Sequence, residues 1–447
     1  MGKQQAGGPK AGPIKTFKYG MPLYGLAWPA GDTFYVCGGG GAVSSGIKNR
    51  LVCAEATGGS LTDQTGEFHF GLDCPTRLIV SPDAKSIVFA MGKGGIQRLD
   101  MDVGKGKPPK FTEVTGAIAD RCKAIKIPDV KAMAFHPSGE LLALGGDDGS
   151  LVVYEWPSLK VKLDLSGDKK MADAVKDLAF APHAVPGPNA PASSAPAPSA
   201  SGPWRGSGRA LVAVLDNGSA HVLDLDRGGA LLCKAAMAKG PEFKSDKVML
   251  ITSEDRLLLH HLPPGMESAQ FTRVTCRGAE GERPTLVCLM NNRAGCHVAL
   301  WELGDDGLLS MRAACRAAEA PGACLDATAD GGMAAVCTSE GDVVLVACRP
   351  HVRVLKRFPK QHMVFTTCIT FSADGAHVLS TAADASATIN STAVAPPPDL
   401  KKILFLILIF LAIVMMCLRQ FIKVMKAQGY SHEEIRAMLG FRPKTEL

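Results

Sequence analysis

The sequence predicts an all-β fold, a seven-bladed β-propeller of divergent WD repeats, followed by a single C-terminal transmembrane helix. Two observations support this prediction. Short apolar strands recur with a period of roughly 40 residues and are joined by Asp-Gly-like turns, which is typical of propeller blades. Near the C-terminus, residues 403–418 read ILFLILIFLAIVMMCL and contain no charged residue.

Each repeat consists of an apolar strand, a Pro-Asp-Gly-like turn, a second apolar strand, a small-residue turn and a third strand. Ala134–Trp156 is the clearest copy and reads AFHPSGELLALGGDDGSLVVYEW. The Trp-Asp dipeptide of standard WD repeats is missing, and Glu155-Trp156 and Trp301-Glu302 come nearest to it. Because one blade cannot bury both of its faces, several must close into a ring.

Counting the repeats gives six or seven blades, and we expect Ile14–Tyr19 to complete the last blade and close the ring. The predicted blades lie near residues 20–56, 72–102, 129–157, 175–226, 242–303, 323–348 and 366–392. The predicted domains are a flexible N-terminus (1–13), the propeller (14–394) with a disordered Pro/Ala/Ser insertion (181–209), a transmembrane helix (400–422) and a short tail (423–447).

The composition is that of a globular protein with a sizeable core, at 46% hydrophobic and 21% charged residues. The net charge of +6 comes without a dominant basic block, so nucleic acid is not an expected partner. The 14 cysteines include no C-x-x-C motif, and most stand singly in apolar runs. Thiols used in this way as small hydrophobic residues indicate a reducing compartment.

The apolar stretch near the C-terminus predicts a membrane span. It is a little shorter than the usual ~20 residues, but the flanking Lys401, Lys402 and Arg419 can extend their charges to the interface. The positive charges slightly favour a cytosolic tail, whereas the reduced cysteines favour a cytosolic propeller. We expect the second arrangement, with the C-terminus in the lumen of the endoplasmic reticulum (ER). The final Lys444-Thr445-Glu446-Leu447 is one substitution from the KDEL retrieval signal, and Ser431 to Glu434 predict a capping box.

One loop in the first predicted blade stands out by its glycines. Cys37–Arg50 reads CGGGGAVSSGIKNR between two apolar strands. It resembles a phosphate-binding P-loop only superficially, because Ile47 separates Gly46 from Lys48 and no helix follows. A flexible hairpin is one interpretation. The other is an ion site, since exposed carbonyls and the Asn49 amide can replace the hydration shell of K⁺ and stiffen the loop behind Ile47.

A divergent propeller with GGGG-x(4)-GIKN in its first blade and one C-terminal span resembles the Sec-twelve family. These proteins are ER-anchored guanine nucleotide exchange factors for the Sar-type small GTPase that starts COPII coat assembly. Their relatives include the animal prolactin regulatory element-binding protein and the plant phosphate transporter traffic facilitator. The resemblance implies that Ile47 and Asn49 contact the GTPase. It also implies potassium ligands in the loop: Gly38, Gly39, Gly40, Gly41, Gly46 and Asn49.

The expected function is therefore non-covalent nucleotide exchange on a Sar-type GTPase, in ER-to-Golgi transport and with COPII components as possible further partners. Many relatives carry Lys-Thr where this sequence has Ser44-Ser45, which removes a charge from the loop. The alternative function is a non-catalytic ER adaptor that escorts membrane cargo such as phosphate transporters.

Overall fold

The computed structural model describes residues 14–41, 45–104, 109–181, 209–238, 246–252, 256–277, 285–304, 307–394 and 400–439. The predicted flexible N-terminus (1–13), Ser44, all but the ends of the predicted insertion (181–209) and the KTEL sequence lie outside these residues. The chain divides into two compact units, Met1–Ala393 and Val394–Leu447.

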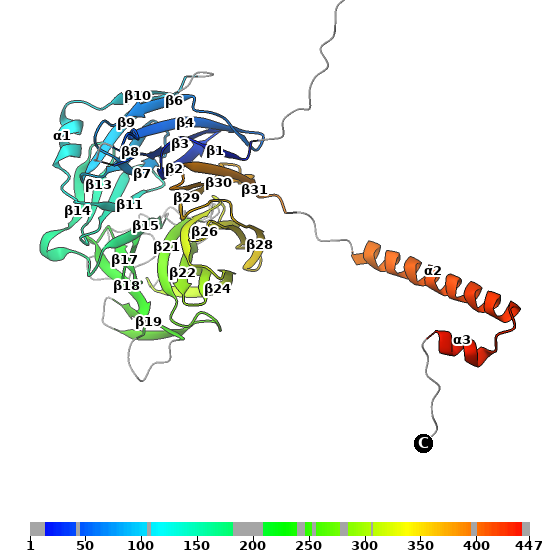
Figure 1. Cartoon of the computed structure of the whole chain (residues 1–447). Helices are drawn as coiled ribbons and strands as arrows, with labels where there is room; N and C mark the ends of the chain where they lie inside the picture. Colours follow the sequence, from blue (N-terminus) through cyan, green and yellow to red (C-terminus); the bar gives the residue numbers. More distant parts are fainter. Residues whose placement is uncertain are drawn as a thin grey trace, which may run out of the picture. The chain divides into compact units, whose positions relative to one another are not determined.

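The first unit is a seven-bladed β-propeller, so the predicted fold class is confirmed (Figure 1). Its described strands form seven sheets of four to six strands, mostly in meander order. The first strands of successive blades lie side by side around the ring, and the first strand of blade 1 also packs beside that of blade 7.

Blades 1 to 3 consist of these strands: β2 (Leu23–Ala30), β3 (Thr33–Gly38), β4 (Arg50–Thr57), β5 (Ser60–Leu61) and β6 (Gly66–His69); β7 (Pro75–Val80), β8 (Ser86–Met91), β9 (Ile96–Asp102) and β10 (Lys110–Glu113); β11 (Val130–Phe135), β12 (Leu141–Gly146), β13 (Leu151–Glu155) and β14 (Lys160–Leu165). Helix α1 (Ala117–Ala124), which was not predicted, lies between blades 2 and 3, and a 3-10 helix η1 (Gly167–Lys169) follows blade 3.

Blades 4 to 7 consist of these strands: β15 (Val175–Ala181), β16 (Ala210–Leu215), β17 (Ala220–Asp224), β18 (Ala230–Met237), β19 (Lys247–Thr252) and β20 (Leu257–His261); β21 (Gln270–Arg277), β22 (Thr285–Asn292), β23 (Gly295–Leu303) and β24 (Leu309–Ala318); β25 (Gly322–Ala327), β26 (Met333–Thr338), β27 (Val343–Ala347) and β28 (Arg353–Phe358); β29 (Thr366–Phe371), β30 (His377–Ala382), β31 (Ser386–Ser391) and the N-terminal β1 (Thr16–Lys18).

The N-terminal strand closes the ring, as the sequence predicted. Strand β1 pairs antiparallel with β31, placing Thr16 opposite Thr388 and Lys18 opposite Ser386. The predicted range of the fifth blade, 242–303, is wrong. Strand β18 continues into an antiparallel pairing with β19, so the β19–β20 hairpin extends blade 4 outward, and blade 5 begins only at β21.

The sequence of each strand matches its place in the blade. The second strands are the most buried, and β8, β12 and β16 have no exposed residue, because sheets of neighbouring blades cover both of their faces. Outer strands such as β14 face water and carry several exposed residues. The turn after the first strand also repeats, since Ser81, Thr328 and Ser372 each donate a hydrogen bond to an aspartate two residues later, at 2.6 Å.

A β-bulge recurs near the start of the first strand in all seven blades. At each one the register skips a single residue, which a bulge leaves unpaired and turns toward a new direction. The extra residues are Tyr24, Thr76, Lys131, Lys176, Thr272, Ala323 and Thr367. The entrance to the central channel is therefore lined by side chains that an unbroken strand would aim elsewhere.

A buried polar network ties the seventh blade together. His362 Nε2 lies 2.7 Å from Ser380 Oγ, and its Nδ1 lies 2.8 Å from Ser386 Oγ, which in turn donates to Asp384. Only 3% of His362 is exposed, and this desolvation lowers its pKa to about 4. The imidazole is therefore neutral at physiological pH.

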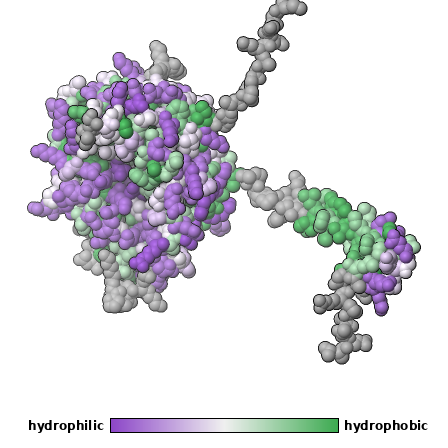
Figure 2. Space-filling model, in the orientation of Figure 1, coloured by the Kyte–Doolittle hydropathy of each residue, from purple (hydrophilic) through white to green (hydrophobic). Residues whose placement is uncertain are grey.

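The second unit holds α2 (Leu400–Ala427) and α3 (His432–Met438). Residues Leu404–Ala427 of α2 are long and apolar enough to cross a membrane, and none of this segment is buried in the described structure. Figure 2 shows a nearly continuous hydrophobic surface along much of this helix, whereas the visible propeller surface is mostly hydrophilic. Helix α3 begins with the predicted capping box, because Ser431 N donates to Glu434 Oε2 (2.8 Å) and Glu434 N donates to Ser431 Oγ (3.3 Å).

Candidate functional site

The glycine loop, residues 39–49, joins strands β3 and β4 of blade 1. These strands pair antiparallel along their whole length, and Gly38 opposite Arg50 is the last pair before the loop. Residues 42–44 of the loop lie outside the described part of the chain. The loop thus leaves a rigid, buried hairpin, in which β3 has no exposed residue.

Close approach of the backbone explains the first two glycines. A Cβ atom at Gly38 would lie 1.9 Å from the carbonyl oxygen of Pro22, and Gly39 N donates a hydrogen bond to that same oxygen (3.2 Å). At Gly39, which has φ +153°, a Cβ would lie 2.2 Å from Asn49 Oδ1. No other residue type fits at either position without moving the backbone.

Asn49 connects the two ends of the loop. It is 4% exposed, and its Oδ1 accepts a hydrogen bond from Gly41 N (3.1 Å). Its Nδ2 donates to the carbonyl oxygens of Gly41 (3.0 Å) and Gly71 (3.1 Å). The side chain therefore acts as a clasp that holds the glycine run against the connection between β6 and β7.

Ile47 lies outside this clasp. It is 41% exposed, and its backbone N donates to Ser45 Oγ at 3.3 Å. A Cβ at Gly40 would lie 3.1 Å from the Ile47 carbonyl oxygen, so the glycine run passes directly beside this residue. Gly46, with φ +76°, turns the chain before Ile47, and a Cβ there would meet nothing within 4 Å. The structure therefore places Gly38 to Gly41 and Asn49 together, and leaves Gly46 and Ile47 on the outer turn.

Two further residues support the loop and were not found from the sequence. Gly71 supplies the third oxygen around the Asn49 amide, although it lies 22 residues further along the chain. Arg50, at the base of the loop, donates to the Tyr19 carbonyl oxygen (2.6 Å) and to Glu67 Oε2 (2.7 Å). This hydrogen bond lowers the pKa of Glu67. The loop and its base are thus bonded to the chain before β2, at Tyr19, and to the chain after β4, at Glu67 and Gly71.

The oxygens around Asn49 are of the type that a hard monovalent cation takes. Asn49 Oδ1 accepts from Gly41 N, the carbonyl oxygens of Gly41 and Gly71 accept from Asn49 Nδ2, and each of the three oxygens has a second lone pair. Among the described residues, no group of three or more His, Cys, Asp or Glu side chains could hold a metal ion. The loop chemistry therefore fits an alkali cation and does not resemble a transition-metal site.

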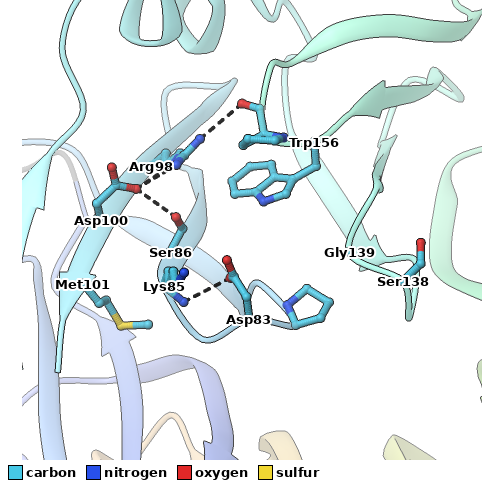
Figure 3. A pocket seen from close by; sticks show the side chains of 11 residues that line it. Asp83, Lys85, Ser86, Arg98, Asp100, Met101, Ser138, Gly139 and Trp156 are labelled. Atoms are coloured by element: carbon cyan, nitrogen blue, oxygen red, sulfur yellow. Dashed lines mark hydrogen bonds and ion pairs between the residues drawn. The ribbon is translucent and has the colours of Figure 1, made fainter.

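Apart from the glycine loop, a hollow of about 520 Å³ lies between blades 2 and 3 (Figure 3). Its polar groups are largely bonded to one another. Arg98 donates to Asp100 Oδ1 (3.0 Å) and to the Pro157 carbonyl (3.2 Å), and its guanidinium lies over the Trp156 ring at 4.4 Å. Because Arg98 is 8% exposed and fully engaged, we interpret this hollow as the seam between two blades.

The cysteines are consistent with a reducing compartment. All 14 are free, and 11 of them are buried. Burial raises the pKa of Cys122 to about 11 and that of Cys276 to about 12, so these thiols stay protonated. They act as small core residues and not as nucleophiles.

Comparisons with known proteins agree with this architecture. Residues 125–155 match the family model described as WD domain, G-beta repeat. The chain is 29% identical over 147 residues to SEC12-like protein 2 of Arabidopsis thaliana, and this match covers 30% of the chain and 34% of that protein. The matched region is thus about a third of the length of this relative.

Among solved structures, Sqt1 from Chaetomium thermophilum has a TM-score of 0.56 at 12% identity, covering 85% of this chain and 99% of that one. The C-terminal WD40 domain of Sif2 has a TM-score of 0.50 at 12% identity, covering 86% and 100%. At such identities the likeness shows the fold alone. The chain is thus a seven-bladed β-propeller that contains a WD repeat at residues 125–155 and is similar over part of its length to SEC12-like protein 2.

Proposed function

We propose that this protein is a guanine nucleotide exchange factor for a Sar-type small GTPase, and that it starts COPII vesicle formation at the ER membrane. The observation that carries the proposal is the glycine loop, in which Asn49 fixes the backbone while Ile47 remains 41% exposed. Among the described residues of the loop, Ile47 is the exposed apolar side chain, which suits it to enter a partner. The relationship to SEC12-like proteins supports a small GTPase as that partner.

Exchange needs no covalent step. The factor has to bind the nucleotide-free GTPase better than the loaded form, and by linkage the affinity for nucleotide falls by the same factor. Each ~1.4 kcal/mol of differential binding weakens nucleotide binding tenfold. Full burial of an isoleucine side chain contributes about 1.5–3 kcal/mol, and Ile47 starts 41% exposed, so covering it supplies about 0.6–1.2 kcal/mol, up to about one of these factors of ten.

Potassium is part of the proposal. Asn49 Oδ1 and the carbonyl oxygens of the glycine run, Gly38 to Gly41, would hold the ion, with Gly46 at the far end of the loop. A bound cation would supply a fixed positive charge that organises these carbonyls. The residues of the chain do the rest: Asn49 connects the two ends of the loop, and Ile47 is presented to the partner.

The proposed location is the ER membrane, with α2 as a single span, the propeller in the cytosol and the tail from residue 423 in the lumen. The apolar helix and the free thiols of the propeller support this arrangement. Addition of protease to sealed microsomes should then digest the propeller and protect the segment after α2. Digestion of the tail with protection of the propeller would reverse the orientation.

The first test measures GDP release from a purified Sar-type GTPase, using the full chain reconstituted in lipid nanodiscs. We expect faster release with the wild type and a several-fold loss with Ile47→Ser. Val161→Ser is a matched control, because Val161 is 58% exposed on β14, outside the glycine loop. GTPase binding without faster release would favour the adaptor alternative.

The second test addresses the ion. Exchange is measured in potassium and in sodium at equal ionic strength, for the wild type and for Asn49→Ala. We expect the wild type to be faster in potassium and the variant to show no difference between the two salts. Equal wild-type rates in both salts would remove the ion from the mechanism and leave exchange itself to the first test.

A further inference from the structure

The mouth of the central channel lies on the same face as the glycine loop. Strands of a blade alternate in direction, so the connections into each first strand and those between each second and third strand emerge on one face. The glycine loop is a connection of the second kind, between β3 and β4. Residues 359–365, which lead from β28 into β29, are a connection of the first kind.

A cavity of about 420 Å³ opens at this mouth. It is lined by bulge residues of several blades and by their neighbours: Tyr24, Thr76, Arg77, Lys176, Thr272, Arg273, Asn291, Gly322, Ala323, Cys324, Phe365, Thr366 and Thr367. Three of these side chains are cationic, and the lining includes no carboxylate. This volume can take one or two side chains of a bound segment.

The three cations outnumber the two carboxylates near them, Asp216 and Asp177. Lys176 forms an ion pair with Asp216 at 2.9 Å. Arg273 Nη1 donates to the backbone carbonyls of Lys176 (3.5 Å) and Thr272 (3.1 Å), and the Arg77 side chain makes no hydrogen bond or ion pair of its own within the described part of the chain. The carboxyl of Asp177 accepts a hydrogen bond from Val274 N (2.8 Å) and is the carboxylate that the two arginines share: burial raises its pKa, and the charges of Arg273 and Arg77 lower it.

An apolar edge borders these arginines. Phe365, which lines the cavity, is 58% exposed, and Met363 and Val364 before it are 87% and 39% exposed. Exposed large apolar side chains beside a charged hollow are typical of binding surfaces. A small anion would use the arginines and leave this edge uncovered, whereas a peptide segment uses both.

We propose that the channel mouth binds an acidic peptide segment of a protein partner. Arg77 and Arg273 pair with its carboxylates, and Phe365 packs against one of its apolar side chains. Guanidinium groups suit this role because they bind carboxylates through two parallel hydrogen bonds. The site does not depend on exchange activity, but its position lets one partner contact the channel mouth and the glycine loop together.

The test uses the full chain in nanodiscs and a fluorescein-labelled ten-residue peptide of Glu, Phe and Gly, with fluorescence anisotropy as the measurement. We expect the Glu peptide to bind and its Gln counterpart to bind at least tenfold more weakly. Arg77→Gln and Phe365→Ser should each weaken binding of the Glu peptide about tenfold. Arg353→Gln, at an exposed position on the outer strand β28, is the matched control and should bind normally.

Ile47→Ser should also bind the peptide normally, so failure of the exchange proposal and failure of this one are told apart. If Arg77→Gln does not fold, Met363→Ser takes its place in the binding measurement, because Met363 is almost fully exposed and its replacement leaves the core intact. Equal binding of the Glu and Gln peptides, or an equal loss in Arg353→Gln, would overturn the proposal. Tight binding of inositol hexakisphosphate that Phe365→Ser leaves unchanged would also overturn it, in favour of a small-anion site.

Discussion

Replacement of Asn49 by alanine should release the glycine loop without unfolding the propeller. The side chain is 4% exposed and makes three hydrogen bonds of 3.0–3.1 Å, to Gly41 N and to the carbonyls of Gly41 and Gly71. A net contribution of about 1 kcal/mol for each bond gives about 3 kcal/mol for the clasp. The population of loops that have opened should therefore rise about a hundredfold.

Native-state hydrogen exchange measures this opening directly. In Asn49→Ala, the Gly41 amide should lose protection by up to about two orders of magnitude, because its acceptor has been removed. The Phe70 amide is an internal reference, since it donates to the backbone carbonyl of residue 49, which the substitution keeps. The urea midpoint should change little, because the loop opens locally.

Asn291→Ala provides a matched control elsewhere in the ring. Asn291 makes the same kind of clasp, accepting from Gly322 N and donating to Gly322 O, both at 2.9 Å. This variant should deprotect Gly322 and leave Gly41 unchanged. If Gly41 exchanges at the wild-type rate in Asn49→Ala, the side chain does not hold the loop, and the explanation of its rigidity is wrong.

Three more predictions concern the loop, the seventh blade and the membrane helix. Gly39→Ala should abolish the acceleration of nucleotide exchange while the propeller still unfolds cooperatively, because the new Cβ would lie 2.2 Å from Asn49 Oδ1. Wild-type rates of nucleotide exchange in this variant would contradict the close packing. His362 has its pKa lowered to about 4, so the unfolded state, with a pKa near 6.5, binds more protons between these values. Its contribution of about 3 kcal/mol is thus complete above pH 6.5 and lost as the pH falls toward 4. Urea titrations should show this slope in the wild type and a flatter one in His362→Gln, and parallel slopes would refute the assignment. Finally, alkaline carbonate should leave the wild type in the membrane pellet and release a variant lacking residues 400–427; release of both would mean that α2 does not span a membrane.

Much of the fold could be predicted because it is encoded locally. Blade turns such as the one at Ser81 contain their own hydrogen-bond partners within five residues, so the repeat is visible in the sequence. The β19–β20 hairpin was misplaced because its strands look like those of any blade. Only the antiparallel pairing of β18 with β19, from Cys233 opposite Thr252 to Met237 opposite Val248, assigns them to the fourth sheet.

The site shows the same division between local and distant contacts. The glycines, Ile47 and Asn49 stand in one segment and could be singled out from it. Gly71 and Tyr19 could not, because Gly71 meets the loop through the pairing of β6 with β4, and Tyr19 through the segment that follows the closing strand β1. The arginines of the channel mouth were missed for the same reason, since Arg77 and Arg273 are almost 200 residues apart and share a cavity only when seven first strands surround it.

The closing strand has a consequence for synthesis. Strand β1 can join its sheet only after β31 has been made, because Thr16 pairs with Thr388, 372 residues later. Contacts of such separation form slowly in folding. The Tyr19 carbonyl, which accepts from Arg50 at the base of the glycine loop, follows β1 directly, and Tyr19 N is bonded to Ala385 O of the seventh blade. A nascent chain that stalls before the seventh blade therefore carries the loop without its anchor at Tyr19. Completion of the ring would thus act as a checkpoint, keeping unfinished molecules from engaging the partner.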